Sequence, residues 1–219
     1  GTYTGVIHNL VLNVDKQGGK IIFKTNCNNK KELEKVINDY FDLNRNYKSE
    51  RNKLAKIDQY LKEATKYGKG IRILNQDLWE TIISFIISAN NNIPHIKKII
   101  EELSKRYGSK ISFDGKTYYS FPTSKQLSKA SVQDLRNVGL GFRDKRIYET
   151  TKFINENKAF LEELKKEDTK VVKEKLLELS GVGPKVADCI LLFSELKRFD
   201  VFPIDVWVRR VMNDLYIHN

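Results

Sequence analysis

The sequence predicts an α+β protein, in which a partial N-terminal antiparallel β-sheet precedes a mostly α-helical body. β-Forming residues dominate residues 3–25, apolar residues recur at helical spacing from residue 30 onward, and a Gly-x-Gly hairpin at residues 181–183 separates two helical patterns. We therefore expect a sheet domain with one helix over residues 1–43 and a helical domain over residues 44–219.

Composition favours a nucleic-acid partner. The chain has 219 residues, enough for one large or two small domains, and 40% of them are hydrophobic, enough for a core. Its 39 Lys and Arg residues outnumber 28 Asp and Glu residues, and the net charge of +11 suits a polyanion such as DNA. A lysine-rich solvated surface is an alternative explanation for part of this surplus.

Cysteine spacing and hydropathy indicate the cellular compartment in which the protein is expected. Cys27 and Cys189 lie far apart and fit no zinc or iron–sulfur spacing, which also suits a reducing compartment. No apolar run approaches the ~18 residues of a membrane span, and no signal peptide is visible. We expect a cytoplasmic bacterial or archaeal protein without a membrane partner.

The first residues read as a β-hairpin. Residues 3–14 and 20–25 are rich in β-formers, with a turn from Asp15 to Gly19. Because a lone hairpin is only marginally stable, we expect further strands or a helix to cover it. Residues 30–41 have helical spacing, and we expect natural sequence upstream of the present first strand.

The body is predicted to be helical almost throughout. Residues 45–67 form a charged amphipathic stretch, best explained as a solvated helix, whereas residues 75–89 form a helix that is apolar nearly all round and therefore buried. Residues 109–123 read as a loop with a turn signal at Asp114-Gly115. Further helices are expected after Asn92, at Ser131 and, as a pair, within residues 158–179.

A run of three asparagines, Asn90, Asn91 and Asn92, ends the apolar helix, and His95 follows in the first turn of the next helix. Asparagine tolerates the left-handed conformation, so one of them is explained as a helix stop. Three in succession are less usual. A packing or capping role is the alternative for His95.

Residues 135–143 end in Gly-Phe-Arg, which places Phe142 beside Arg143 on a glycine-rich turn. An aromatic ring beside an arginine suits stacking on bases and hydrogen bonding to base edges. The segment also echoes residues 179–185, because both read apolar-x-x-Val-Gly-x and then a basic helix start. Simple recurrence of a helix–turn–helix device is the alternative.

The hairpin Gly181-Val182-Gly183 is too tight to continue a helix, and Pro184 suits the first position of a new one. Uncovered amides at a helix N-terminus bind an anion such as a phosphate. Lys185 follows in the first turn, where the helix dipole disfavours a protonated amine and so favours a nucleophile.

Asp205 follows Pro203-Ile204, at the position of a carboxylate that caps the next helix. Trp207 is expected to pack in the core. In an ordinary helical protein Asp205 would be only a cap and Lys185 only a solvated helix lysine.

Taken together, residues 181–189 (Gly-Val-Gly-Pro-Lys-Val-Ala-Asp-Cys) and 203–206 (Pro-Ile-Asp-Val) resemble the helix-hairpin-helix DNA glycosylase superfamily, and within it the 8-oxoguanine DNA glycosylase/AP lyases. The resemblance implies that Lys185 attacks the sugar C1′ and that Asp205 stabilises the cationic transition state. It further implies that Cys189, one turn beyond the lysine, lines the base pocket.

The resemblance also implies a set of DNA contacts. Asn90 would fill the gap opposite an extruded base, Phe142 would act as a wedge, and Arg143 would reach the estranged base. His95 stands where the strictest members have an arginine. The implied DNA-binding residues are Asn90, Asn91, Asn92, His95, Phe142, Arg143, Gly181, Val182 and Gly183.

No cofactor and no side-chain metal ligands are implied. The resemblance does imply a structural monovalent or divalent cation held by the backbone carbonyls of Leu177, Leu179 and Val182. The family's final helix is expected to follow the last residue of this sequence.

The function implied is removal of 8-oxoguanine from duplex DNA by a monomer, with AP lyase activity through a lysine Schiff base. One alternative is a non-catalytic helix-hairpin-helix DNA-binding module, which would not require the Lys185–Asp205 pair. Another is a glycosylase of the same fold for other damaged bases. Lys185 argues against an alkylbase enzyme, and the missing cluster cysteines argue against an adenine glycosylase.

Overall fold

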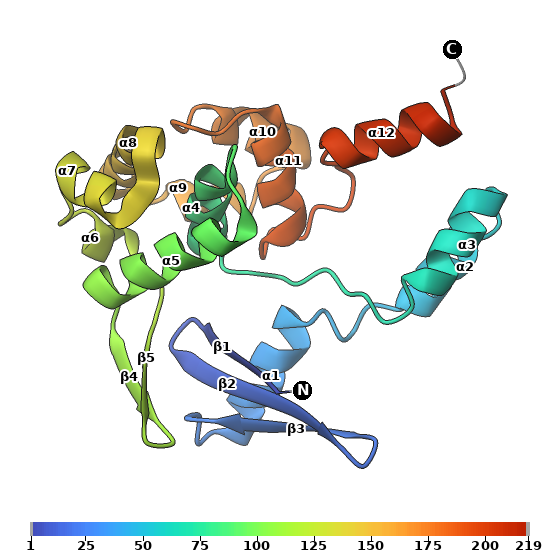
Figure 1. Ribbon diagram of the computed structural model, residues 1–219, viewed down its shortest axis with the longest axis horizontal. Helices are drawn as coiled ribbons and strands as arrows, with labels where there is room; N and C mark the ends of the chain where they lie inside the picture. The colour runs from blue at the N-terminus through green and yellow to red at the C-terminus, as the bar shows by residue number, and fades with distance from the viewer. Residues whose placement is uncertain (1, 218–219) are drawn as a thin grey trace.

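The computed structural model of the protein describes residues 2–217, and Figure 1 shows a sheet with its helix at one end and a helical body at the other. The sheet contains three antiparallel strands in the order β1 (Tyr3–Ile7), β2 (Leu10–Gln17) and β3 (Lys20–Thr25). The prediction of one strand over residues 3–14 is therefore wrong. The chain reverses within two residues at His8, which has a φ of 53°, and no glycine signals this turn in the sequence.

Helix α1 (Lys30–Tyr40) covers the sheet, as expected for a small sheet that needs a partner. Asn29 caps it by accepting hydrogen bonds from the amides of Lys31 and Glu32. Ile7, Leu12 and Ile37 form a small hydrophobic cluster that is separate from the larger cluster of the body.

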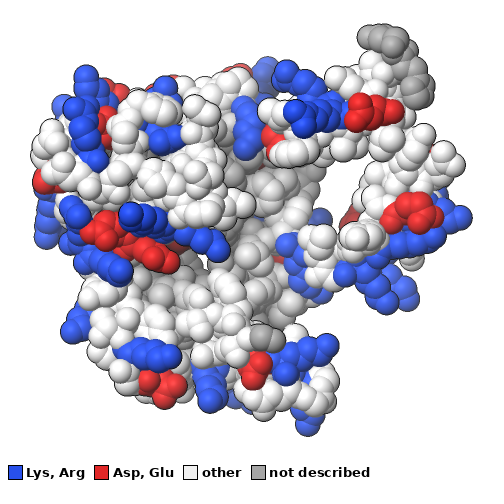
Figure 2. Space-filling model, in the orientation of Figure 1, with Lys and Arg blue, Asp and Glu red and all other residues white. Residues whose placement is uncertain are grey.

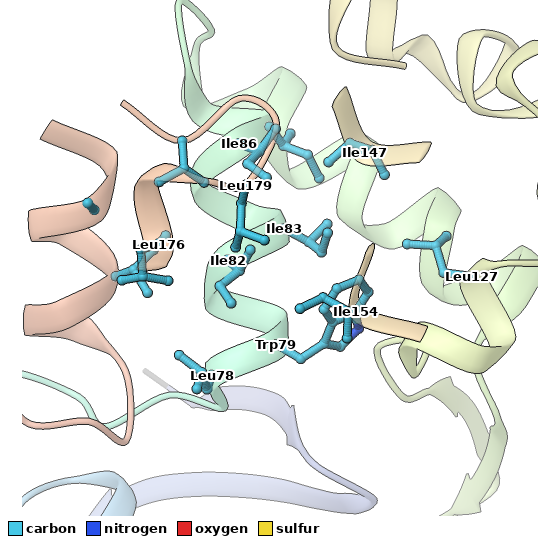
Figure 3. Packing of buried hydrophobic residues seen from close by; sticks show 14 of the residues in the cluster. Leu78, Trp79, Ile82, Ile83, Ile86, Leu127, Ile147, Ile154, Leu176 and Leu179 are labelled. Carbon is cyan, nitrogen blue, oxygen red and sulfur yellow. The ribbon is translucent and has the colours of Figure 1, made fainter. Parts of the chain in front are cut away.

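Helix α4 (Leu78–Ser88) is the centre of the helical body, and the prediction that it is buried is confirmed. Ile82, Ile83 and Ile86 are fully buried, and Figure 3 shows core side chains from neighbouring helices directed at this helix. Trp79 completes the packing by donating its indole N–H to the carbonyl of Pro122 at 2.9 Å. The apolar pattern of residues 75–89 thus buries α4 in the main hydrophobic cluster of the body.

The other helices of the body pack around α4. They are α5 (Ile93–Tyr107), α6 (Ser124–Leu127), α7 (Val132–Leu135), α8 (Asp144–Glu156), α9 (Phe160–Leu164), α10 (Thr169–Leu177) and α11 (Pro184–Phe193). Between α7 and α8 the chain forms a π-helical turn, η1 (Arg136–Leu140), and a 3₁₀ turn, η2 (Gly141–Arg143). Ser131 caps α7 as predicted, in a capping box with Asp134.

Two segments between the helices differ from the sequence prediction. Residues 109–123, expected as a loop, contain a hairpin of β4 (Lys110–Phe113) and β5 (Lys116–Tyr119), turned at Asp114 and Gly115 with φ values of 49° and 69°. An Asp-Gly pair with positive φ at both positions is typical of a two-residue β-hairpin turn. Residues 45–67 form two helices, α2 (Tyr47–Leu54) and α3 (Gln59–Tyr67), because Asp58 caps a new helix there.

Helix α12 (Val206–Leu215) extends away from the body and meets α3 only near its far end (Figure 1). There the Tyr216 hydroxyl donates to Asp58 at 3.0 Å. Trp207 is 69% exposed, so the expectation that it packs in the core is wrong. No helix among residues 2–217 is long and apolar enough to cross a membrane.

Candidate functional site

The Gly-Val-Gly hairpin joins α10 to α11 and uses its two glycines differently. Gly181 has a φ of +88°, the left-handed region that favours glycine, and a Cβ there would lie 3.0 Å from side-chain atoms of both Ile86 and Arg146. Gly183 is extended, with a φ of −99°, and a Cβ added there would meet no other atom within 4 Å. The conformational freedom of glycine is therefore required at Gly181, whereas the backbone conformation of Gly183 is open to any residue.

Helix α11 begins with uncovered amides. Gly183 is its N-cap, Pro184 occupies the first turn as predicted, and no described side chain caps this end. Val182 is buried at 7% exposure and anchors the hairpin in the core. The first turn of α11 thus presents backbone N–H groups with the positive end of the helix dipole, an arrangement that favours an anion.

Lys185 is exposed in that first turn, and its Nζ lies 5.7 Å from the centroid of the Phe85 ring. Phe85 stacks on Phe193 with ring centroids 5.8 Å apart. The amine therefore stands beside an apolar aromatic wall. Phe85 was not singled out from the sequence, because a phenylalanine within an apolar helix is indistinguishable from core.

Asp205 caps α12, since its Oδ1 accepts a hydrogen bond from the Val208 amide at 2.8 Å. The capping role predicted from the sequence is confirmed. The carboxylate remains exposed, so the cap does not prevent it from facing a ligand.

Cys189 lies on α11 one turn beyond Lys185, and the charges of both Lys185 and Asp205 act on the pKa of its thiol. Burial raises the pKa of the Cys189 thiol, the positive charge of Lys185 opposes that shift, and the negative charges of Asp188 and Asp205 add to it. The residue Cys189 is 3% exposed. The buried thiol and the exposed Lys185 amine thus lie one helical turn apart on α11.

The three asparagines behave differently from one another. Asn92 caps α5 by accepting from the His95 amide at 3.0 Å, and Asn91 donates to the Ile87 carbonyl at 3.0 Å. Asn90 adopts a left-handed conformation with a φ of 51°, and it is exposed. The turn geometry is thus built by Asn91 and Asn92, which leaves the side chain of Asn90 to face outward.

His95 connects this turn to the next one. One ring nitrogen lies 3.0 Å from the Asn91 side-chain oxygen, and the other would lie 3.5 Å from a Cβ on Gly139. The imidazole is partly buried. The packing role considered as the alternative for His95 is therefore present, whatever its role towards DNA.

Phe142 and Arg143 point in different directions. Phe142 is 55% exposed on η2, whereas Arg143 is 5% exposed. The Arg143 guanidinium donates to the carbonyls of Ala89, Asn90 and Leu140. Burial lowers the pKa of Arg143, and the charge of Arg146 adds to this effect. Arg143 thus ties the Asn90 turn to the Phe142 turn, a role that sequence reasoning did not anticipate.

The carbonyls expected to hold a cation are Leu177, Leu179 and Val182. One of them is already engaged, because the Leu179 carbonyl accepts from the Val182 amide at 3.0 Å. Within residues 2–217 no group of three or more His, Cys, Asp or Glu side chains is arranged to hold a metal ion. A cation at the hairpin would therefore depend on backbone oxygens.

Comparison with known families covers the whole chain. Residues 1–82 match the family described as 8-oxoguanine DNA glycosylase, N-terminal domain. Residues 83–219 match the HhH-GPD superfamily base excision DNA repair proteins. The second match begins inside α4, in the element that carries the core of the body.

Individual relatives agree with these matches. An N-glycosylase/DNA lyase of Saccharomyces cerevisiae is 42% identical over 155 residues, 65% of this chain and 41% of that protein. A probable N-glycosylase/DNA lyase of Methanothermobacter thermautotrophicus is 35% identical over 179 residues, 73% of this chain and 57% of that protein. The chain thus spans about half the length of the curated relatives it matches.

A solved structure is similar over nearly the whole chain. The 8-oxoguanine glycosylase/lyase of Clostridium acetobutylicum, in complex with double-stranded DNA containing cytosine opposite 8-oxoguanine, superposes with a TM-score of 0.92. It is 41% identical, and the match covers 99% of this chain and 73% of that chain. The architecture, the hairpin and the two family matches agree: this chain belongs to the HhH-GPD superfamily of base excision DNA repair proteins and carries the N-terminal domain of its 8-oxoguanine DNA glycosylases.

Proposed function

We propose that this protein removes 8-oxoguanine from duplex DNA and then nicks the strand through AP lyase chemistry at Lys185. The observation that carries the proposal is the exposed Lys185 amine in the first turn of α11, beside uncovered helix amides, together with the exposed Asp205 carboxylate at the start of α12. Binding alone would require the amides but neither the amine nor the carboxylate. The names of the yeast and archaeal relatives support the same reaction.

The chemistry follows from the position of the reacting atom. C1′ of a stacked nucleotide is shielded, so the nucleotide must leave the helix. As the glycosidic bond breaks, positive charge develops on the sugar, and the Asp205 carboxylate opposes it. The Lys185 amine forms a bond to C1′ while the base departs with the electron pair of the glycosidic bond. Loss of a proton from nitrogen and opening of the sugar ring give an imine.

The imine makes the second step feasible. It withdraws electrons from C2′, so a proton is lost there and the 3′ phosphate departs by β-elimination. Hydrolysis of the remaining imine releases Lys185. Because Cys189 is buried and its pKa is raised, its thiol contributes apolar volume and not a competing nucleophile.

The surrounding residues supply the DNA contacts in this proposal. The amides of Gly181, Val182 and Gly183 bind a phosphate next to the lesion, with a backbone-bound monovalent or divalent cation at Leu177, Leu179 and Val182. Asn90 would fill the gap opposite the extruded base, and Phe142 would act as the wedge. Both side chains are exposed at neighbouring turns, which supports these roles. Those turns are held in place by Arg143, Asn91, Asn92 and His95. A direct contact of Arg143 with the estranged base would require its guanidinium to leave the carbonyls that it binds.

We extend the proposal to organisation and location. The division into residues 1–43 and 44–219 is supported by the two separate hydrophobic clusters. A cytoplasmic, monomeric repair protein of a bacterium or archaeon fits the archaeal and bacterial relatives, although yeast and plant proteins are also similar.

Borohydride trapping tests the proposal. The wild-type protein, incubated with duplex DNA containing 8-oxoguanine and reduced, should form a covalent adduct and release the base. Lys185→Gln should lose both activities, and Asp205→Asn should slow base release while leaving DNA affinity near the wild-type value. Lys170→Gln is a matched control, because it removes an exposed lysine of the preceding helix α10 that forms no ion pair within residues 2–217. An adduct that persists in Lys185→Gln would show that another residue is the nucleophile.

A further inference from the structure

We propose that Arg146 binds a DNA backbone phosphate between the Gly181 hairpin and Phe142, and so anchors the duplex where the two functional turns meet. The inference rests on the proposed function for the identity of the ligand, duplex DNA. It assigns a contact to a residue that lies outside both glycine motifs.

The stem of Arg146 is fixed against the hairpin. A Cβ on Gly181 would lie 3.0 Å from Arg146 Cδ and 3.1 Å from its Cβ, so the hairpin backbone and this side chain are in close contact. Arg146 is the third residue of α8 and lies four residues after Phe142, which belongs to η2. Its position is therefore determined by both turns at once.

The head of Arg146 reaches the second turn. Its Cζ lies 5.2 Å from the centroid of the Phe142 ring, whose other cationic neighbour is Arg143 at 4.3 Å. A guanidinium at this distance is attracted to the aromatic face. The side chain thus spans the space between the hairpin and the exposed ring.

No described carboxylate neutralises Arg146, which forms no ion pair within residues 2–217. The acids nearest to it on α8 are engaged elsewhere. Asp144 is 1% exposed and accepts from Arg136 at 2.7 Å, and Glu149 accepts from the Ser180 hydroxyl at 2.6 Å. The guanidiniums of Arg143 and Arg146 lie over the same Phe142 ring, and burial together with the charge of Arg146 lowers the pKa of Arg143. An anion placed here would relieve the repulsion between these two like charges.

The chemistry favours a phosphate over a base edge. A guanidinium presents a planar fork that matches phosphate oxygens with two parallel hydrogen bonds. Arg143 cannot offer its fork to DNA while it holds the carbonyls of Ala89 and Asn90. Arg146 is partly exposed and stands beside amides that themselves suit a phosphate. The backbone of one DNA strand is therefore the ligand of matching charge and shape.

A salt titration of DNA affinity tests the assignment. Fluorescence anisotropy would follow a labelled duplex, with and without 8-oxoguanine, bound to the wild type and to Arg146→Met, which keeps an unbranched stem against Gly181. Each phosphate that a protein neutralises adds ~0.9 to the slope of log affinity against log salt. We expect Arg146→Met to lose about one such unit and about tenfold in low-salt affinity, equally on both duplexes.

Two further variants separate a contact from a general charge effect. Lys152→Met removes one positive charge from the same helix, at a position that pairs with Glu156 and touches neither turn. It should leave the slope unchanged. Arg146→Lys keeps the charge and should retain the wild-type slope. Thermal melting of all three variants shows whether each is folded.

The outcomes are distinct from those of the proposed function. A wild-type slope in folded Arg146→Met, or an equal loss in Lys152→Met, would overturn the assignment. If the wild type binds DNA with the expected change in Arg146→Met but forms no borohydride adduct, the phosphate contact stands and the proposed chemistry fails. If the adduct forms and the slope does not change, the proposed function stands and the assignment of Arg146 fails.

Discussion

The hairpin at residues 179–185 and the turn at residues 135–143 share a sequence pattern but present different groups to solvent. At the hairpin the basic residue, Lys185, is exposed beside uncovered amides. At the other turn the basic residue, Arg143, is buried and the aromatic Phe142 is exposed. The comparison shows that a repeated glycine pattern determines the shape of a turn, whereas nearby acceptors determine which side chain remains free.

The acceptors explain the difference. Arg143 lies beside the end of α4, where the carbonyls of Ala89 and Asn90 are directed at its guanidinium. Lys185 lies at the start of a helix, which exposes donors and no carbonyls. The Arg143 side chain is therefore buried against carbonyls, whereas the Lys185 side chain remains exposed to solvent.

The largest expected effect separates these two basic residues by stability. Arg143→Met should lower the free energy of unfolding by about 2–4 kcal/mol, because it removes a buried side chain that donates to the carbonyls of Ala89, Asn90 and Leu140. Lys185→Met should change it by less than about 0.5 kcal/mol, since the side chain is exposed. Chemical denaturation of both variants measures the difference. An equal free energy of unfolding in the two variants would mean that the hydrogen bonds of the Arg143 guanidinium contribute little to stability. The proposed difference between the two turns would then be contradicted.

A second effect separates the two hairpin glycines. Gly181→Ala should cost about 1–3 kcal/mol, because the residue has positive φ and its new methyl group would press on Ile86 and Arg146. Gly183→Ala should be tolerated in the free protein, since its φ is negative and the space is open. If Gly183 is where a phosphate approaches the backbone, the same variant should weaken DNA binding.

Melting temperature and DNA affinity, measured on both glycine variants, give the two readouts independently. Gly181→Ala should be the less stable protein, and Gly183→Ala should be the folded protein with weakened binding. A stable Gly183→Ala variant with unchanged affinity would remove Gly183 from the DNA interface.

The smallest expected effect concerns the base opposite the lesion. His95 has at most two ring donors and contacts Asn91 and Gly139, so it lacks the charged fork with which an arginine would read cytosine. Such contacts discriminate by ~1–3 kcal/mol, so excision opposite adenine or thymine should be within about tenfold to a hundredfold of excision opposite cytosine. His95→Arg should widen that gap. Single-turnover rates against four opposing bases measure it, and a wild-type preference for cytosine far beyond this range would refute the idea.

Local patterns in the sequence predicted the main helices of the body and several of their ends. The apolar period of residues 75–89, the capping positions of Ser131 and Asp205, and Pro184 at the start of α11 act over a few residues, and the structure places each as expected. Local chemistry was misread at three places. At His8 a turn lacked its usual signal, at Asp114 the signal was attributed to a loop, and at Asp58 the start of a second helix was overlooked.

Tertiary structure alone decided which side chains are free to act. Arg143 is withdrawn by carbonyls more than fifty residues away, and Arg146 is held by a glycine that follows it by thirty-five residues. Trp207 is exposed because α12 leaves the body, which no helical period can indicate. The physical reason is common to all three. Burial and pairing depend on groups that the fold brings from elsewhere, whereas helix formation, capping and turn geometry depend on neighbours along the chain.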